Sequence, residues 1–177
     1  LARAQGVRLR EVTHPLRDLV LAGELAAEVE CLAEDVYRRQ HDALDEALQG
    51  RPDAQALQAV GAALNEASLR LRLTYHGQSV VLAGDAYGAC WQEEARPCTV
   101  FKVPHHGSDK ALGKDLAQRL SPEISVISCG AYREDGRPDP AVVSWLREAS
   151  GEVYCTDACE VPGLSGENHR AVTVRLA

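Results

Sequence analysis

The sequence contains no methionine, a single phenylalanine and few aromatic residues, which make up 5% of its 177 residues. No apolar run approaches the ~18 residues that a membrane-spanning helix needs, so we expect no membrane-spanning segment. Because the chain begins with Leu1 and lacks methionine, we expect it to be part of a longer protein, and this end does not report on targeting.

Basic residues are in the minority, with 19 Lys and Arg against 26 Asp and Glu, which gives a formal net charge of −7. This balance argues against a broad nucleic-acid-binding face, because such faces are normally basic. It leaves open a small active site that handles phosphates through metal ions. The share of hydrophobic residues, 45%, and of charged residues, 25%, is typical of globular proteins and excludes a wholly disordered chain.

The six cysteines include no Cys-x-x-Cys pair. The closest two are Cys155 and Cys159, which are compatible with half of a zinc site, a redox pair, or two small residues packed near the end of a strand. We favour packing, because no second close Cys/His pair completes a structural zinc set. Cysteines without evident disulfide partners favour a cytoplasmic location.

Strands alternate with helices along the chain, which predicts an α/β layered fold. A helical hairpin is expected over about residues 33–63, inserted between strands. Alternation places Leu69, Leu71 and Leu73 on one face of a strand. The expected strands are 7–12, 19–21, 26–32, 68–75, 79–83, 99–103, 124–129, 152–156 and 171–176; the later helices are 110–120, capped by Ser108 or Asp109, and 140–149, capped by Asp139.

Two loops that follow apolar strands carry the residues that could bind metals or take part in catalysis. Ligand sites in α/β sheets gather beyond the carboxyl ends of strands. Asp85, in Gly-Asp, can bind or bridge metal ions, although Gly-Asp is also a common turn. His105 and His106, in Pro-His-His-Gly-Ser, are of the residue type that most often ligates metals and shuttles protons near neutral pH. The alternative for this pair is two histidines exposed on a surface loop.

Taken in order, the motifs form a series: Asn65-Glu66-Ala67-Ser68-Leu69, then Gly84-Asp85, then Lys102-Val103-Pro104-His105-His106-Gly107-Ser108, then Val126-Ile127-Ser128-Cys129-Gly130. The series resembles the metallo-β-lactamase superfamily, and more narrowly the branch related to the hydrolase domain of competence-type DNA-uptake channels. The resemblance covers about residues 6–177, and its most specific part is the Pro-His-His-Gly-Ser loop.

This resemblance implies an αββα sandwich with a metal cleft along one edge and metal-dependent hydrolysis of a phosphodiester or a related bond. Zinc, as a pair of ions, is the expected cofactor, with manganese as the alternative. Asp85 is expected to bridge the metals, His106 to ligate one of them, and His105 to act as a catalytic proton shuttle or substrate contact. The substrate is expected to be DNA, a nucleotide or a smaller phosphoester. The channel-linked relatives favour an extracytoplasmic location, whereas the cysteines favour a cytoplasmic one.

The family's principal ligand motif, His-x-His-x-Asp-His, is absent from this sequence. That motif lies in the N-terminal half of the family fold, so residues 1–177 correspond to its C-terminal half. Half of a sandwich would leave one sheet face uncovered, and we therefore expect a partner: the missing N-terminal half, a second chain, or another copy in a homo-oligomer. The alternative function is a degenerate member of the fold that serves as a binding or assembly module without catalysis.

A second departure concerns the loop that contains Arg137. Relatives often carry His-Pro there, whereas this sequence reads Gly136-Arg137-Pro138-Asp139-Pro140. Two interpretations of Arg137 stay open: a contact to an anionic substrate, or a solvated side chain on a loop.

Overall fold

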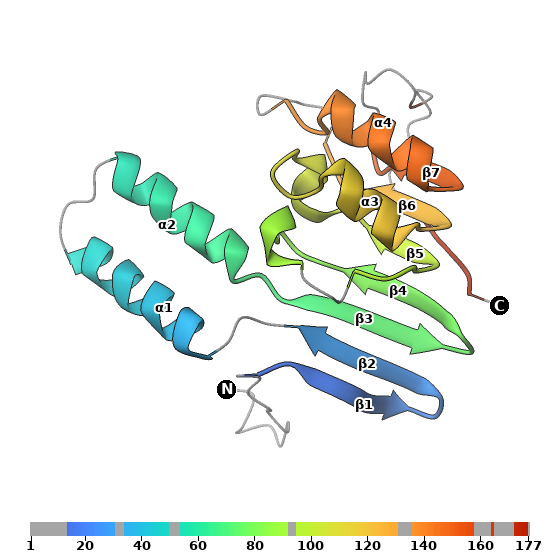
Figure 1. The fold of residues 1–177 in the computed structure, drawn as a ribbon, viewed down its shortest axis with the longest axis horizontal. Helices are drawn as coiled ribbons and strands as arrows, with labels where there is room; N and C mark the ends of the chain where they lie inside the picture. Colours follow the sequence, from blue (N-terminus) through green and yellow to red (C-terminus); the bar gives the residue numbers. More distant parts are fainter. Residues whose placement is uncertain are drawn as a thin grey trace.

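A computed structural model of the chain describes residues 14–30, 34–49, 54–91, 95–130, 136–157, 164 and 172–176. These residues form one seven-stranded sheet and four α-helices, so the predicted α/β class is confirmed (Figure 1). The strands are β1 (Leu16–Ala22), β2 (Leu25–Glu30), β3 (Arg70–Tyr75), β4 (Gln78–Leu82), β5 (Val100–Lys102), β6 (Ile124–Ile127) and β7 (Glu152–Cys155). The helices are α1 (Glu34–Gln49), α2 (Ala54–Glu66), α3 (Lys114–Leu120) and α4 (Pro140–Ala149).

The sheet is mixed, and its strands lie side by side in the order of the sequence. Neighbouring strands are antiparallel from β1 to β4 and parallel from β4 to β7. Helix α3 connects β5 to β6 and helix α4 connects β6 to β7, as parallel pairing requires a crossover. Because β4, β5 and β6 run in the same direction, the loops that follow them leave the sheet at one edge.

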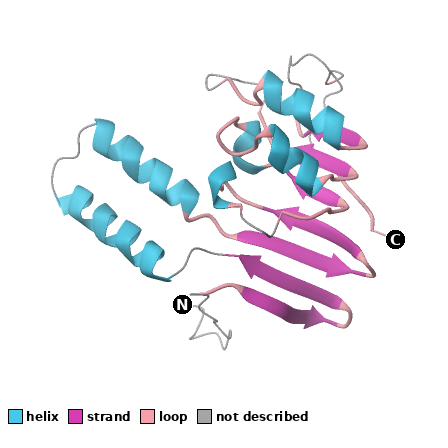
Figure 2. Ribbon diagram, viewed as in Figure 1, coloured by secondary structure: helices cyan, strands magenta, loops and turns pink. Residues whose placement is uncertain are grey.

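The hydrophobic core lies between the sheet and helices α3 and α4, which cover the same face (Figure 2). Val81, Phe101 and Ser125 are paired in register across β4, β5 and β6, and all three are buried. Leu112, in the turn before α3, packs on this face together with Leu116 and other residues of α3 and α4. The strands that contribute these core residues, β4 and β5, are therefore the strands that the loops of Asp85 and the two histidines follow.

The opposite face of the sheet carries both apolar and charged residues and is only partly covered. The next residues in the same register are Leu82, Lys102 and Val126. Leu82 is 37% exposed, and the other two are half-buried. Residues 172–175 line a hollow on this face together with Ile124, Glu152 and Tyr154. The partly exposed apolar residues of this face, Leu82 and Val126, are suited to packing against another layer.

The segment between β2 and β3 forms the predicted helical hairpin, with α1 and α2 packed on one another. The hairpin projects from the edge of the sheet where β2 ends and β3 begins (Figure 1). Since Leu71 of β3 pairs with Leu82 of β4, this is also the edge at which β4 ends. The base of the hairpin and the two candidate loops are thus at the same edge.

The cap predicted for helix α4 is confirmed, whereas the start of α3 was placed too early. The carboxylate Oδ1 of Asp139 accepts a hydrogen bond from the Ala141 amide at 2.7 Å. Helix α3 begins at Lys114 rather than at Lys110, because residues 108–112 form a separate turn. In that turn the Ser108 carbonyl accepts the amides of Ala111 and Leu112 at 3.0 and 3.2 Å.

Other predicted boundaries also need correction. Leu69 lies before β3 and is 52% exposed, so it does not share the half-buried position of Leu71 and Leu73. Strand β6 ends at Ile127, two residues before Cys129. Residues 172–176 are not in a strand. The strand predicted over 7–12 lies outside the described residues.

Within the described ranges, Cys90 and Cys98 are free thiols. Cys155 is buried at the end of β7, as expected for a packed residue near a strand end. Cys159 lies outside the described residues, so the zinc and redox interpretations of the pair are not tested.

We predict that Cys98 reacts very slowly with iodoacetamide in the folded protein. Burial raises the pKa of its thiol from 9.0 to about 11, an effect that the charge of Glu123 adds to and that of Arg72 opposes. The reactive thiolate is therefore about 100-fold scarcer at pH 8 than for a cysteine with the ordinary value. Mass spectrometry after timed alkylation measures the rate. Unfolding in urea should restore fast labelling, and equal rates in the folded and unfolded states would contradict the prediction.

Candidate functional site

The loops after β4 and β5 are joined by a backbone hydrogen bond. Leu82 and Lys102, the last residues of these strands, are paired in the parallel register. Farther along the two loops, the amide of His105 donates to the carbonyl of Gly84 at 3.0 Å. This bond brings Asp85 and the two histidines to the same edge of the sheet, which is where ligand sites of α/β folds form.

The histidine loop has an unusual backbone. It forms a short 3₁₀ turn, Pro104–Gly107, in which His105 (φ 47°, ψ 42°) and His106 (φ 57°, ψ 25°) are both left-handed. This conformation costs roughly 1–2 kcal/mol for each non-glycine residue. Strain of this kind persists only where the surroundings enforce it, and it clusters at functional sites.

Gly107 holds this loop against the segment before α4. Its carbonyl accepts the amide of Asp139 at 2.9 Å, and its own φ is +81°. A Cβ added at Gly107 would lie 2.7 Å from the Cβ of Pro138, so the two segments are in direct contact. Only glycine fits here without displacing Pro138.

His106 is exposed, and its ring orientation is fixed by one hydrogen bond. Nδ1 lies 2.7 Å from the carbonyl oxygen of Ser128, just beyond the end of β6. Because a carbonyl can only accept, Nδ1 carries the proton, and in the neutral imidazole the lone pair is on Nε2. Metal-binding histidines commonly donate their other ring N–H to such a carbonyl, which fixes the tautomer and the ring.

His105, in contrast, is buried, with 9% of its surface exposed. Its ring stacks on Tyr87, with 5.9 Å between ring centroids and 14° between planes. The hydroxyl of Tyr87 in turn accepts a hydrogen bond from the Asn65 side-chain amide at 3.3 Å. The end of α2 is thereby linked to the histidine loop through Tyr87.

Asp85 is half-buried and acts electrostatically on Lys102 at the end of β5. Burial lowers the pKa of Lys102, and the negative charge of Asp85 opposes that shift. The preceding Gly84 has a φ of +53°, and a Cβ there would approach the side chain of Ser68 to 3.5 Å. The Asn65–Ser68 segment therefore borders both loops.

The predicted site residues do not by themselves make a complete metal centre. Within the ranges that the structure describes, no three His, Cys, Asp or Glu side chains lie close enough together to hold a metal ion. Arg137 is half-buried in the segment next to Pro138, which packs on the histidine loop. The fold thus places Asp85, His105, His106 and Arg137 around one edge, and the ligand roles stay predictions.

Sequence reasoning did not single out Tyr87 or the Ser128 carbonyl. An aromatic residue two positions after Gly-Asp is a weak signal for Tyr87. The role of Ser128 depends on its backbone carbonyl, which any residue would supply, so the sequence carries no signal for it.

Comparison with models of known protein families and with curated proteins finds no match to this chain. No helix in the described ranges is long and apolar enough to cross a membrane. The family relationship accordingly depends on the motifs and on the geometry of the two loops, and it enters below as a proposal.

Proposed function

We propose that the protein is a metal-dependent hydrolase of the metallo-β-lactamase type that cleaves phosphodiester or related bonds. The observation that carries this proposal is the His106 ring. Its Nδ1–H is held by the Ser128 carbonyl, which leaves the Nε2 lone pair for a metal. The ring is also exposed, so a metal can reach it without a rearrangement of the core.

In this proposal Asp85 bridges two metal ions and His106 ligates one of them. Zinc suits a carboxylate and imidazole donor set, and manganese is the alternative. When bound, the metals polarise the scissile group and activate water. Asp85 is suitably placed, because the His105–Gly84 hydrogen bond ties its loop to the histidine loop.

His105 has a different role in the proposal. Its buried ring is stacked on Tyr87, which restricts the ring to one orientation. An imidazole held in this way can accept and return a proton in the reaction. Arg137, on the adjoining loop, would contact the anionic substrate through its guanidinium.

A tetrahedral zinc site requires about four ligands, and Asp85 and His106 supply only two of them. We propose that the remaining ligands come from the other half of an αββα sandwich, either in the same protein or in a partner chain. The half-exposed row Leu82, Lys102 and Val126 supports this, because that half would cover it.

The test is the metal content and the hydrolytic activity of the full-length protein. We expect about two zinc or manganese ions per chain, hydrolysis of bis(p-nitrophenyl) phosphate, and loss of this activity with a chelator. Full-length protein that contains no metal and shows no hydrolysis would favour the alternative, a binding or assembly module on the same scaffold. The incomplete ligand set in the described residues is the observation that favours that alternative.

A further inference from the structure

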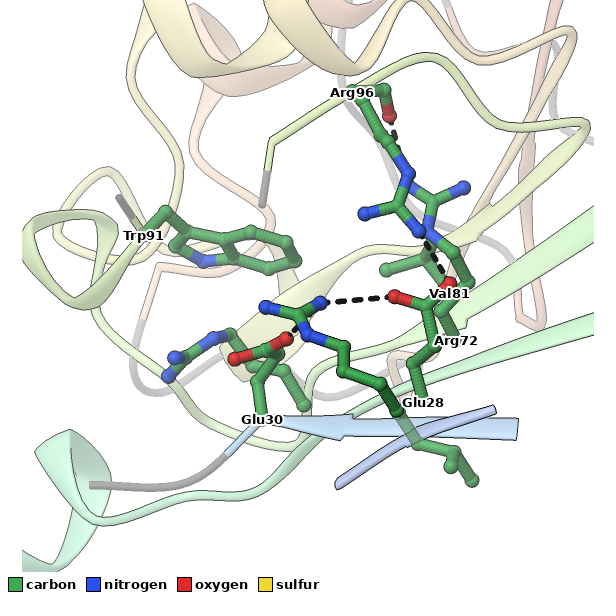
Figure 3. A pocket seen from close by; sticks show the side chains of 9 residues that line it. Glu28, Glu30, Arg72, Val81, Trp91 and Arg96 are labelled. Atoms are coloured by element: carbon green, nitrogen blue, oxygen red, sulfur yellow. Dashed lines mark hydrogen bonds and ion pairs between the residues drawn. The ribbon is translucent and has the colours of Figure 1, made fainter. Parts of the chain in front are cut away.

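A small cavity lies on the core side of strands β2, β3 and β4, beside the segment that carries Trp91 (Figure 3). Its volume is about 20 Å³, which is room for about one water-sized group. The lining residues share an unusual composition, because four of the nine are arginines: Arg17, Glu28, Glu30, Arg70, Leu71, Arg72, Val81, Trp91 and Arg96.

The two carboxylates of the cavity are already engaged by arginines. Glu28 accepts a hydrogen bond from Arg17 at 2.9 Å and another from Arg96. Glu30 also pairs with Arg17. Burial raises the pKa of Glu28, but the hydrogen bonds from Arg96 and Arg17 lower it overall, so the carboxylate is charged at neutral pH.

Arg72 is also satisfied, and its acceptors are neutral. Its guanidinium donates to the Ser79 hydroxyl at 2.8 Å and to the carbonyls of Pro97 and Arg96 at 3.0 and 2.8 Å. The lining therefore contains four guanidinium groups and two carboxylates, but only Arg70 and Arg72 are buried, because Arg17 and Arg96 are 49% and 44% exposed.

Arg70 is the exception in this network. Its side chain is 5% exposed, and neither Nε nor Nη1 has a hydrogen-bond partner in the part of the chain that the structure describes. Trp91 is 6% exposed, and its indole Nε1 likewise has no acceptor among those residues. The two side chains are adjacent, with the Arg70 Cζ 5.6 Å from the Trp91 ring centroid.

Buried donors without acceptors are costly, and a buried charge without a counter-ion more so. The open groups of Arg70 and Trp91 are all donors, whereas a water that accepted from them would also have to place its own two protons. A cation does not suit open N–H donors, and a phosphate ester or nucleotide is too large for about 20 Å³. A small anion can accept hydrogen bonds from all of these donors.

We propose that this cavity binds one small monovalent anion, of the size of a halide or formate, which accepts hydrogen bonds from Arg70 and Trp91. Bound there, the anion ties strands β2 and β3 to the segment that carries Trp91. Trp91 and Arg96 lie on the same connection between β4 and β5 as Asp85, but neither Asp85 nor His106 lines the cavity, so the test of this site does not depend on the proposed hydrolase activity.

Bromide is the probe, because its anomalous scattering locates it directly. Crystals of the full-length protein soaked in sodium bromide should show an anomalous peak in contact with the Arg70 guanidinium and the Trp91 indole N–H. Bromide peaks on the surface of the protein with none in this cavity would overturn the proposal.

Thermal unfolding in solution gives an independent readout. At constant ionic strength, with the bulky anion gluconate as replacement, bromide should raise the Tm in a saturable manner by about 3–5 °C at tenfold excess over its Kd. Arg70→Lys keeps the charge but removes the directed N–H donors, so the saturable rise should disappear.

The matched control is Arg119→Lys, because Arg119 is an exposed arginine on α3 that pairs with Asp115 at 3.1 Å. This variant should keep the full bromide response. The same response in the parent, Arg70→Lys and Arg119→Lys would mean a general salt effect and would overturn the proposal. If Arg70→Lys does not fold, the anomalous map of the parent protein decides.

Discussion

Replacing His106 by alanine is expected to remove metal from the full-length protein and to lower kcat/KM for phosphodiester hydrolysis by at least about 100-fold. The reason is the geometry of the ring: the Ser128 carbonyl holds Nδ1–H at 2.7 Å, and Nε2 is the atom left to bind. Asp85→Asn should have an effect of similar size, because an amide is a poorer metal ligand than a carboxylate. Elemental analysis and steady-state kinetics measure the two quantities.

His105→Ala should behave differently. His105 is buried and stacked on Tyr87, and in our proposal it transfers a proton and does not bind a metal ion. We therefore expect its removal to lower kcat by about 10²–10⁴-fold while the metal content stays near that of the parent. Loss of metal in this variant would instead make His105 a ligand.

The matched control for these substitutions is His41→Ala. His41 is 54% exposed on α1, where it pairs with Asp45 at 3.4 Å. Metal content and activity should match those of the parent. Full metal content in both His106→Ala and Asp85→Asn would refute the ligand assignment.

Much of the fold could be predicted because local patterns and tertiary structure agree. Apolar residues at helical spacing predicted α1 and α2, and alternation predicted β3. Asp139 followed by Pro140 predicted the start of α4, since both residues favour that position for local reasons. These signals lie within a few residues of the structure that they determine.

The errors occurred where the local signal was ambiguous. Ser108 and Asp109 are good N-cap residues, but the Ser108 carbonyl closes a turn and α3 begins only after Gly113. Residues 172–176 alternate like a strand yet have no strand partner within the described ranges. Propensity alone does not say which neighbour supplies the hydrogen bonds.

The candidate loops and the arginine cavity also differ in how far the sequence alone could reveal them. Asp85 and the two histidines stand in short motifs, so sequence could single them out. The arginine cavity could not be found so easily, because its members come from β1, β2, β3 and the segment around Trp91. Its signal is the register that sets Glu28 opposite Arg72 and Glu30 opposite Arg70, and this register exists only once β2 and β3 are paired.

Gly107→Ala is the substitution for which we expect the largest loss of stability, about 3–4 kcal/mol. The added methyl group would lie 2.7 Å from the Cβ of Pro138, inside van der Waals contact, and the φ of +81° is itself unfavourable for alanine. Pro138 cannot move freely, because the neighbouring Asp139 amide is bonded to the Gly107 carbonyl at 2.9 Å. Urea unfolding of parent and variant measures the difference in the free energy of unfolding.

Gly77→Ala separates the two causes. Gly77 has nearly the same backbone angle, with a φ of +79°, but a Cβ there meets nothing within 4 Å. It should cost only the conformational part, about 1–2 kcal/mol. Equal losses in the two variants would mean that the Pro138 contact relaxes at little cost. If the larger loss at Gly107 is found, metal binding should weaken in that variant alone, because the displaced loop carries His106, whereas the turn at Gly77 is at the opposite end of β4.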